Sequence, residues 1–178
     1  MSVRQHEVQM KIYVACGLTH VPRNHFTEYT QFIHLIAQNL KSLDSVDDVK
    51  YALVNSDPQL ADKPFSERAR YCYLWDRRMV EEADLVIAEA SFPSTGMGIE
   101  LQLADTAGIP VILCFRDYDG NKIDEVQYEN PDHSLHLLQI GEGYISLMAL
   151  GMPNVRSVIK YQDERDGVSQ ILQAAKFL

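Results

Sequence analysis

Two kinds of hydrophobic pattern alternate along the chain. Short runs rich in Val, Ile and Ala have the composition of strands buried on both faces, and they occupy residues 10–16, 49–54, 85–90, 111–115 and 155–161. Between them, apolar residues recur every three or four positions, as on one face of a helix, over residues 26–40, 66–83, 99–107 and 164–178. This alternation predicts a five-stranded, mostly parallel sheet with right-handed crossovers and helices on both faces, a doubly wound α/β fold.

Two segments interrupt the alternation. Residues 55–65 are polar and contain proline, so we expect a loop there, with Ser66 as the cap of the following helix. Residues 117–144 are charged and rich in turn residues, which predicts an excursion over the surface. Residues 133–150 have a mixed helical character, broken by Gly-Glu-Gly.

The stretch from Asp84 to Pro110 combines a strand, a loop with two glycines and a helix. We expect the loop over residues 91–98, where Gly96 and Gly98 allow tight or positive-φ turns and Ser94 or Thr95 caps the helix. Gly108 and Pro110 then end the helix. Glu100 falls in its first turn, where the positive end of the helix dipole favours the ionised carboxylate. A helix N-terminus after such a loop is suited to an anionic or polar ligand.

The order of the strands would determine where a ligand binds. In a flavodoxin-like or Rossmann-like sheet, ligands bind beyond the carboxyl ends of the strands at which the order reverses. These ends are the loop that begins at Gly17 and the loop over residues 91–98. The fold rule and the local pattern therefore predict a site in the same place.

Composition and charge narrow the class of protein. The 178 residues suit one domain, 1–178, with a full hydrophobic core. The net charge of −9 argues against a partner that is a nucleic-acid polymer. No apolar run reaches the length of a membrane span, and residues 1–7 lack the apolar segment of a signal peptide, so we expect no membrane partner and a cytoplasmic location.

The sequence predicts neither a metal nor a cofactor. The three cysteines lie far apart without a C-x-x-C pair, and the six histidines lack the spacing of metal ligands. Gly96-Met-Gly98 lacks the third glycine of a dinucleotide fingerprint, and the chain has no P-loop.

Asp76 interrupts the apolar stripe of its predicted helix. A carboxylate there is costly unless another group uses it, and two interpretations remain open. In one, Asp76 pairs with Arg77, Arg78 or Arg116. In the other, Asp76 reaches the same crevice as Glu100, and the two carboxylates divide nucleophilic and acid/base work. Glu89, at the end of a strand, either lines this site or is a charge at the exit of the loop.

The residues from Asp76 to Glu100 carry a spaced pattern, D-x6-A-D-x-V-x-A-E-x-x-x-P-S-x-G-x-G-x-E. This pattern resembles the nucleoside 2-deoxyribosyltransferase superfamily, and most of all its 2'-deoxynucleoside 5'-phosphate N-hydrolase branch. Tyr13, in Lys-Ile-Tyr-Val-Ala-Cys-Gly17, is similar to the tyrosine of that family's first strand. The resemblance covers the first strand and residues 70–116, and it fades between residues 18 and 65.

The resemblance implies a role for individual residues. It makes Glu100 the nucleophile, Asp76 the group that acts on the leaving base and orients the nucleophile, and Tyr13 a neighbour of the sugar. Ser94 stands where the hydrolases bind the 5'-phosphate and the transferases carry an aspartate. The alternative for Ser94 is a helix cap alone.

Other parts of the family pattern match less well. The family completes each site with a residue of the neighbouring subunit, which aligns with Asn154 and implies a homodimer or a higher homo-oligomer. The family's glycine-rich loop after the first strand is replaced by Gly17-Leu-Thr-His-Val-Pro-Arg23, in which Thr19, His20 and Arg23 can substitute as phosphate ligands.

These observations predict an enzyme without a metal or cofactor. We expect an N-glycosidase that hydrolyses the base–sugar bond of a (deoxy)nucleoside 5'-monophosphate through a covalent glycosyl-glutamate at Glu100, with Gly17, Gly96 and Gly98 among the substrate-binding residues. One alternative is a nucleoside 2-deoxyribosyltransferase that exchanges bases. Another is a non-catalytic nucleotide-binding protein. The nucleobase and the preference for ribose or deoxyribose stay open.

Overall fold

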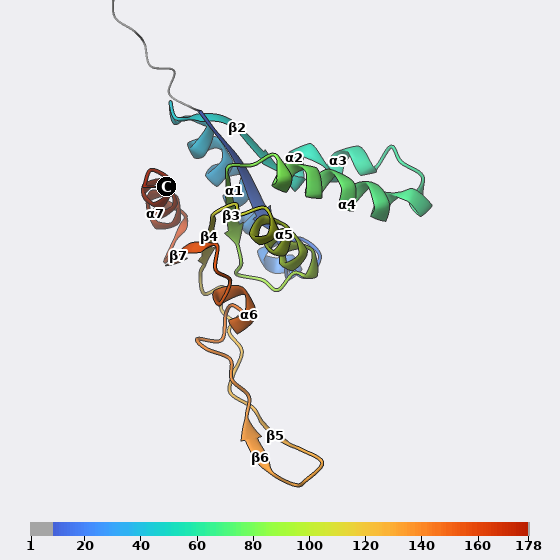
Figure 1. Ribbon diagram of the computed structural model, residues 1–178, viewed down its shortest axis with the longest axis vertical. Coiled ribbons are helices and arrows are strands. Elements are labelled where there is room, and N and C mark those ends of the chain that lie inside the picture. The colour runs from blue at the N-terminus through green and yellow to red at the C-terminus, as the bar shows by residue number, and fades with distance from the viewer. Residues whose placement is uncertain (1–8, 178) are drawn as a thin grey trace, which may run out of the picture.

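The computed structural model describes residues 9–177 and is built around one parallel sheet (Figure 1). The strand order is β2-β1-β3-β4-β7, and the strands are β1 Met10–Cys16, β2 Val46–Tyr51, β3 Leu85–Glu89, β4 Val111–Phe115 and β7 Val155–Lys160. All four pairings in this sheet are parallel. The predicted α/β class is confirmed. The observed order is the flavodoxin-like one of the two that the sequence left open, and it reverses between β1 and β3.

Helices cover both faces of the sheet. Helices α1 (Arg23–Lys41) and α7 (Glu164–Ala175) pack on one face, and α4 (Phe65–Glu81) and α5 (Thr95–Thr106) pack on the other. Alternate residues of β1 enter the two cores, with Ile12 and Val14 toward α1 and Tyr13 and Ala15 toward α5. Tyr13 therefore lies on the face that carries Glu100.

The region between β2 and α4 differs from the prediction. The second strand ends at Tyr51 rather than at residue 54, because the backbone N–H of Tyr51 is bound by the side chain of Asn55 as the chain turns into α2 (Ala52–Asn55). A second short helix, α3 (Asp57–Leu60), follows within the predicted loop. The prediction that Ser66 caps α4 is wrong, since the helix begins at Phe65 after Pro64, whose restricted φ already suits a helix start.

The stretch from Asp84 to Pro110 has a shorter loop than predicted. Helix α5 begins at Thr95, and Ser94 caps it by accepting a 3.1 Å hydrogen bond from the backbone N–H of Met97. Gly96 and Gly98 are therefore helical residues of the first turn, and the expectation of a positive φ there is wrong. Gly108 has a φ of +71° and ends the helix, as predicted.

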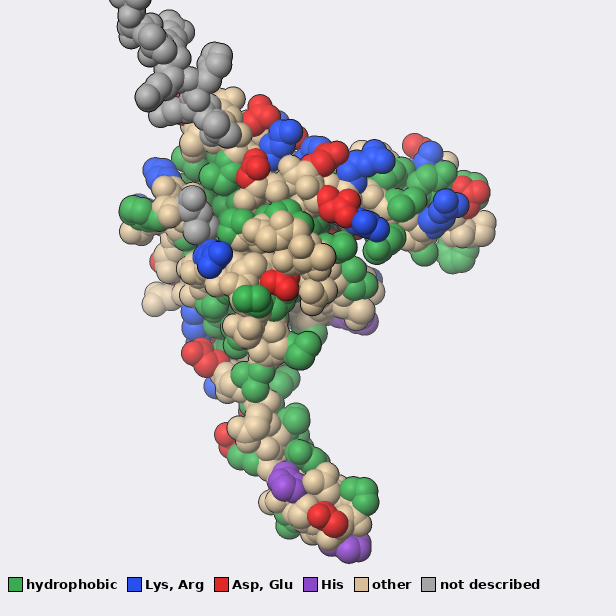
Figure 2. All heavy atoms as spheres, in the orientation of Figure 1, with side chains coloured by type: hydrophobic (Ala, Val, Ile, Leu, Met, Phe, Trp, Pro, Cys, Tyr) green, Lys and Arg blue, Asp and Glu red, His purple; other side chains and the backbone are tan. Residues whose placement is uncertain are grey.

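Residues after β4 leave the body of the protein. They form an antiparallel hairpin of β5 (Gln127–Glu129) and β6 (Leu135–Leu137), which projects below the sheet in Figure 1. The mixed helical character predicted for residues 133–150 is confined to α6 (Leu147–Leu150). The excursion over residues 117–144 is thus an arm that extends outward. Figure 2 shows hydrophobic side chains along it.

Two predictions concern residues at the ends of the chain that the structure does not describe. Residues 1–7, in which we expected no signal peptide, and Leu178, the predicted end of the last helix, lie outside the described residues. None of the helices within residues 9–177 combines the length and apolarity that crossing a membrane requires.

Candidate active site

A cavity of about 250 Å³ opens beyond the carboxyl ends of β1 and β3, where the fold rule predicts a site. It is bordered by the β1–α1 loop, the α2–α3 segment, α4 and the start of α5. Its lining residues include the predicted Asp76, Ser94, Gly96 and Glu100. Ser94 reaches this cavity as the N-cap of α5, and α4 brings Asp76. Glu100 reaches it from the second turn of α5, so the prediction that Glu100 lies in the first turn is wrong, because the helix begins at Thr95 and not at residue 99.

Tyr13 and Glu100 are joined inside the protein. The phenolic hydroxyl of Tyr13 donates a 2.9 Å hydrogen bond to Oε1 of Glu100, and the two residues are 1% and 8% exposed. Burial raises the pKa of the Tyr13 phenol well above its ordinary value, so the hydroxyl stays protonated and keeps its proton to donate. The second carboxylate oxygen of Glu100, Oε2, is buried and has no partner within residues 9–177.

The protonation of Glu100 differs from the expectation. Burial raises its pKa to about 7, the hydrogen bond from Tyr13 lowers it, and the charge of Asp76 raises it further. The expectation that the helix N-terminus keeps Glu100 ionised therefore meets an opposing effect near neutral pH, since burial favours the protonated form. Loss of water around the carboxylate outweighs the partial positive charge of the helix end.

Asp76 faces the cavity rather than an arginine. Its Oδ2 accepts a 3.3 Å hydrogen bond from Sγ of Cys72, one helical turn earlier, and its buried Oδ1 has no partner within residues 9–177. Arg77 pairs with Glu81 at 2.7 Å, and Arg116 pairs with Glu28. The interpretation of Asp76 as part of a structural ion pair is thus wrong.

Cys72 is held as a thiol. Burial raises its pKa to about 12, and the charge of Asp76 and the hydrogen bond to it act in the same direction. A thiol that stays protonated is a weak nucleophile, so Cys72 serves as a donor to Asp76.

The predicted phosphate-binding residues lie at one end of the cavity. Ser94 caps α5, and its hydroxyl proton remains available to a ligand while the oxygen accepts from Met97. Gly17 lets the β1–α1 loop approach this point, because a Cβ at position 17 would lie 3.0 Å from Cβ of Ser94. Thr19 and His20 also line the cavity.

Gly96 and Gly98, predicted to bind the substrate, and Arg23, predicted as a phosphate ligand, lie in different surroundings. A Cβ at Gly96 would lie 3.7 Å from Oγ of Ser94, whereas a Cβ at Gly98 would meet open space. Gly98 lines a neighbouring hollow and not the cavity that contains Glu100. Arg23, at the start of α1, stacks over Phe26 and does not line that cavity either.

Asn154 is not brought together with the other predicted residues. It lies just before β7, at the amino ends of the strands, whereas the cavity lies at their carboxyl ends. Its side chain is 6% exposed and donates a 2.9 Å hydrogen bond to the carbonyl oxygen of Ile109. This environment favours a structural role that holds the α5–β4 connection, and a contribution to a partner's site stays a prediction.

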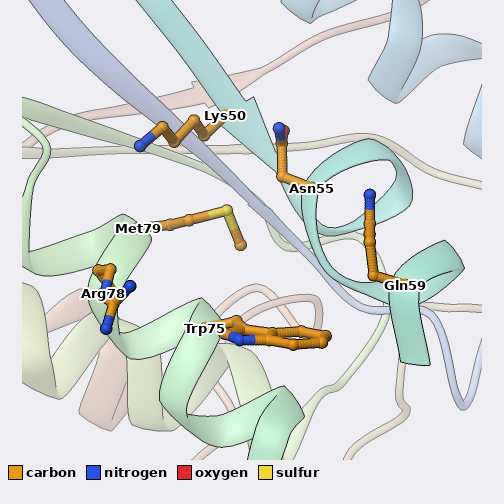
Figure 3. Close-up of a pocket in the computed structure, with 6 residues that line it drawn as sticks. All are labelled: Lys50, Asn55, Gln59, Trp75, Arg78 and Met79. Atoms are coloured by element: carbon orange, nitrogen blue, oxygen red, sulfur yellow. The ribbon is translucent and has the colours of Figure 1, made fainter. Parts of the chain in front are cut away.

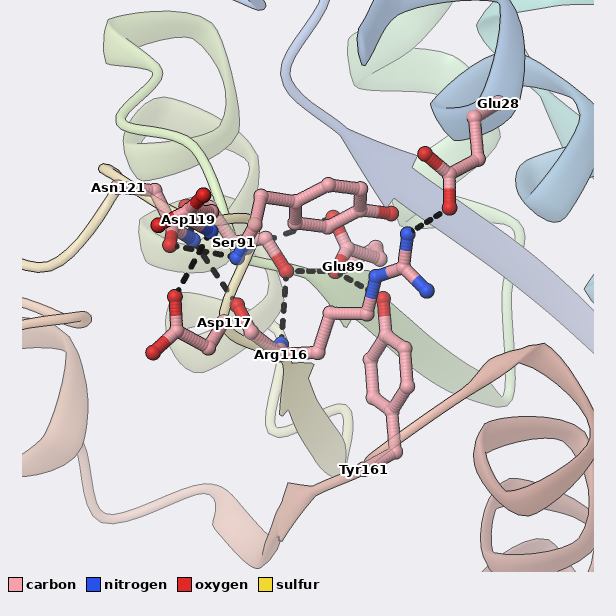
Figure 4. Close-up of polar contacts among 9 residues, drawn as sticks. Glu28, Glu89, Ser91, Arg116, Asp117, Asp119, Asn121 and Tyr161 are labelled. Atoms are coloured by element: carbon pink, nitrogen blue, oxygen red, sulfur yellow. Dashed lines mark hydrogen bonds and ion pairs between the residues drawn. The ribbon is translucent and has the colours of Figure 1, made fainter.

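Glu89 lies on the opposite face of the sheet and joins the segments that follow β3 and β7 (Figure 4). Its carboxylate is fully buried and accepts hydrogen bonds from the hydroxyls of Ser91 and Tyr161, the latter at 2.8 Å. The Ser91 hydroxyl in turn accepts from the backbone N–H of Arg116 at 2.9 Å. Glu89 therefore neither lines the site nor stands as a charge at a loop exit, because it is an interior anchor for the β3–α5 loop.

A separate pocket of about 260 Å³ lies between the α2–α3 segment and the outer side of α4 (Figure 3). It is lined by Lys50, Asn55, Gln59, Trp75, Arg78 and Met79. None of the predicted catalytic or substrate-binding residues reaches it, and its lining contains no carboxylate, so it lacks the groups that glycoside chemistry needs.

The sequence patterns did not identify two residues of the candidate active site. Ser56 and Asp57, at the junction of α2 and α3, line the cavity with Asp76 and Glu100. Residues 55–65 read as an ordinary polar loop, and neither residue belongs to a spaced motif. The short polar helices that bring them to the cavity lack the periodic apolar residues from which a helix is predicted.

Known proteins of similar sequence match part of the chain. No family model matches the chain. A 2'-deoxynucleoside 5'-phosphate N-hydrolase, so named, of Syntrophotalea carbinolica is 32% identical over 59 residues, which are 33% of this chain and 42% of that protein. Its namesake in Methanosarcina barkeri is 34% identical over 80 residues, 45% of this chain and 49% of that protein. The chain thus spans less than half the length of the curated relatives it matches.

Solved structures are similar over nearly the whole chain. The Clostridium botulinum CMP N-glycosidase superposes with a TM-score of 0.54 at 16% identity, covering 92% of this chain and 98% of that one. A conserved protein from Enterococcus faecalis superposes with the same TM-score at 18% identity, covering 93% and 99%. At these identities the superpositions show a shared fold. Together with the named relatives, they confirm that the chain resembles the nucleoside 2-deoxyribosyltransferase-like superfamily, as its motif predicts.

Proposed function

We propose that the protein is an N-glycosidase that hydrolyses the bond between base and sugar in a (deoxy)nucleoside 5'-monophosphate. One observation carries this proposal: Oε2 of Glu100 and Oδ1 of Asp76 are buried carboxylate oxygens without a hydrogen-bond partner among residues 9–177, and both residues line a single cavity. Unpaired buried carboxylate oxygens destabilise a folded protein unless a ligand or a reaction uses them. Most enzymes that hydrolyse glycosidic bonds use a pair of carboxylates.

The first step is a displacement at the anomeric carbon. Oε2 of Glu100 attacks C1', the C1'–N bond breaks, and the base leaves with the electron pair and takes a proton from Asp76 or from a water that bridges to it. Tyr13 holds Oε1 of Glu100 by its 2.9 Å hydrogen bond, so Oε2 is the oxygen left to attack. The product of this step is a glycosyl ester of Glu100.

The second step releases the sugar phosphate. A water molecule transfers a proton to the Asp76 carboxylate as its oxygen attacks C1', and the bond between C1' and Glu100 breaks. The carboxylate of Glu100 is restored, and the sugar carries a hydroxyl at C1'. The net reaction consumes one water and yields free base and a sugar 5'-phosphate.

The 5'-phosphate is assigned to the end of the cavity at Ser94. The hydroxyl of Ser94, together with the first backbone N–H groups of α5, which have no intrahelical acceptors, forms a set of donors for phosphate oxygens. Gly17 permits the close approach of the β1–α1 loop to this point. The names of the N-hydrolase relatives and of the CMP N-glycosidase support a nucleotide as the substrate.

The proposal is tested by a chromatographic screen for released base. The common nucleoside and deoxynucleoside monophosphates are incubated with the protein and with Glu100→Ala, and each is paired with its unphosphorylated nucleoside. We expect base release from nucleotides only, and none with Glu100→Ala. Faster exchange than hydrolysis in the presence of a free acceptor base would favour the transferase. Binding without base release from any nucleotide would favour a non-catalytic nucleotide-binding protein.

Two copies of the chain are proposed to associate. The outward arm exposes apolar side chains from both sides of its hairpin, among them Val126 at 52% and Leu135 at 61%. An isolated two-stranded hairpin is marginally stable in water, so a second copy that packs on the arm explains both its shape and its composition. Light scattering after size exclusion should give a dimer for the native chain and a monomer after Leu135→Ser and Leu137→Ser are combined.

A further inference from the structure

The junction of α2 and α3 holds a hydroxyl that no described protein group uses. Ser56 is 1% exposed, and its Oγ has no hydrogen-bond partner within residues 9–177. Ser56 precedes α3 at the N-cap position, where a serine oxygen ordinarily accepts from a backbone N–H of the first turn, yet it makes no such bond. Buried hydroxyls are nearly always hydrogen-bonded, so an unpaired one indicates a ligand that supplies the missing bond. Ser56 lines the cavity that contains Glu100.

The next residue adds a carboxylate to the same wall. Asp57 lines the cavity and forms no salt bridge within residues 9–177. An ionised carboxylate only accepts hydrogen bonds, whereas a serine hydroxyl can both donate and accept. Ser56 and Asp57 therefore present one donor and one strong acceptor side by side. Ala52 and Leu60 flank them with apolar surface.

This wall adjoins Asp76 rather than Ser94. Helix α3, which begins at Asp57, contacts α4. Helix α4 carries Asp76 and Cys72, whose thiol donates to Asp76. If the phosphate binds at Ser94 and C1' stands at Glu100, as the proposed function requires, the base extends toward Asp76. The edge of the base then meets Ser56 and Asp57.

We propose that Ser56 and Asp57 read the base and select cytosine or adenine. These two bases place an amino group next to an unprotonated ring nitrogen on the same edge. Asp57 accepts a hydrogen bond from the amino group, and the hydroxyl of Ser56 donates to the ring nitrogen. Uracil, thymine, hypoxanthine and guanine place a carbonyl oxygen where the amino group would be, and the Asp57 carboxylate repels it.

The inference rests on the proposed function, and matched substrates test the two separately. The rates of base release are compared for deoxycytidylate with deoxyuridylate and for deoxyadenylate with deoxyinosinate, and the ribonucleotides are tested in the same way. We expect kcat/KM to be at least about tenfold higher for the amino member of each pair, the discrimination that one matched polar contact gives. Asp57→Asn should reduce the ratio to about threefold or less, because an amide can also donate to a carbonyl oxygen.

Controls separate recognition of the base from a loss of folding. Asp62→Asn, an isosteric change in the same connection at an exposed residue that does not line the cavity, should keep the native ratio. Ser56→Ala should lower kcat/KM for the amino members and leave the thermal midpoint unchanged or higher, because it removes an unpaired buried hydroxyl. An unchanged ratio in Asp57→Asn, or native preference for the carbonyl member, would overturn the inference.

A different result would contradict the proposed function. If the native protein released no base from any nucleotide, the catalytic proposal would be wrong, and the recognition could still be measured by calorimetry on Glu100→Gln. Tighter binding of deoxycytidylate than of deoxyuridylate, lost in Asp57→Asn, would support recognition by this wall. Equal affinities would contradict it.

Discussion

The hydroxyl of Tyr13 lies 2.9 Å from Oε1 of Glu100, although 87 positions separate the two residues in the chain. Strand β1 supplies the tyrosine, and the second turn of α5 supplies the glutamate. Because β1 and β3 are neighbours in the sheet, the helix that follows β3 begins beside β1. The contact orients one carboxylate oxygen and leaves the other free, and it also opposes the rise in the pKa of Glu100.

Replacing Tyr13 by Phe should shift the pH profile of the reaction toward higher pH. The hydrogen bond favours the ionised form of Glu100, so its loss raises a pKa that already stands at about 7. A hydrogen bond to a charged group is worth roughly 1.5–3 kcal/mol, which corresponds to a rise of about one unit or more. We expect kcat/KM at pH 7 to fall about tenfold and to approach the native value near pH 9. An equal loss at every pH would show that Tyr13 contacts only the sugar.

Replacing Asp76 by Asn should move the same profile in the opposite direction. The charge of Asp76 helps to raise the pKa of Glu100, so the amide lowers that pKa and extends the active range toward acid. The maximal rate should nevertheless fall about 100-fold, because general acid–base assistance to the leaving base is lost. Arg77→Gln on the outer side of α4 is the control, since Arg77 pairs with Glu81. A maximal rate close to the native one would remove Asp76 from the proposed chemistry.

Two substitutions at Ser94 separate its cap from its proposed phosphate contact. Aspartate is as good a helix cap as serine, so Ser94→Asp should keep the stability of α5 while its charge repels a 5'-phosphate. Ser94→Ala loses the cap, with a cost of about 1 kcal/mol in the free energy of unfolding. We expect kcat/KM for nucleotides to fall about 100-fold in Ser94→Asp and less in Ser94→Ala. Full nucleotide activity of Ser94→Asp, measured beside its thermal midpoint, would refute a phosphate contact at this residue.

The sequence predicted the parts of the site that share a local motif. Ser94 and Glu100 lie on one loop and helix, and the buried strand before them has an apolar run that fixes its place in the sheet. Tyr13 follows from the first strand in the same way. A hydrophobic period identifies strands and long helices well, because burial on one or both faces determines it.

The rest of the site depends on tertiary contacts, which produce no periodic hydrophobic pattern in the local sequence. Ser56 reaches the cavity through two helices of four residues, each too short for an apolar stripe. Glu89 was visible as a charge, but its partner Tyr161 lies 72 residues away and on another strand end. The direction of the pKa shift at Glu100 was missed for a similar reason, since burial is a property of the whole fold.

Glu100→Gln should stabilise the protein at alkaline pH. The pKa of Glu100 is raised to about 7 by burial, above the value of about 4.3 of an unfolded chain. The group therefore favours the folded state below about pH 4, and this contribution is lost as the pH rises through about 7. The loss of stability amounts to about 4 kcal/mol at pH 8, and the glutamine avoids it. Urea unfolding at pH 5 and pH 8 should show a gain that is larger at pH 8, whereas Glu125→Gln on the exposed arm should show none.

The anchor around Glu89 makes a prediction for stability. Glu89→Ala leaves the buried hydroxyls of Tyr161 and Ser91 without their acceptor, and each unsatisfied group costs about 1–3 kcal/mol. We expect a loss of about 3 kcal/mol in the free energy of unfolding. Glu89→Gln should lose less, because its amide oxygen still accepts from Tyr161.

A double-mutant cycle identifies the source of the loss. Tyr161→Phe alone removes one donor to Glu89, and in the Glu89→Ala background it removes a hydroxyl that has no acceptor. The combined variant should therefore unfold with a smaller loss than the sum of the two single losses, by about 1 kcal/mol or more. Additive losses would mean that the 2.8 Å contact between Tyr161 and Glu89 contributes nothing to stability.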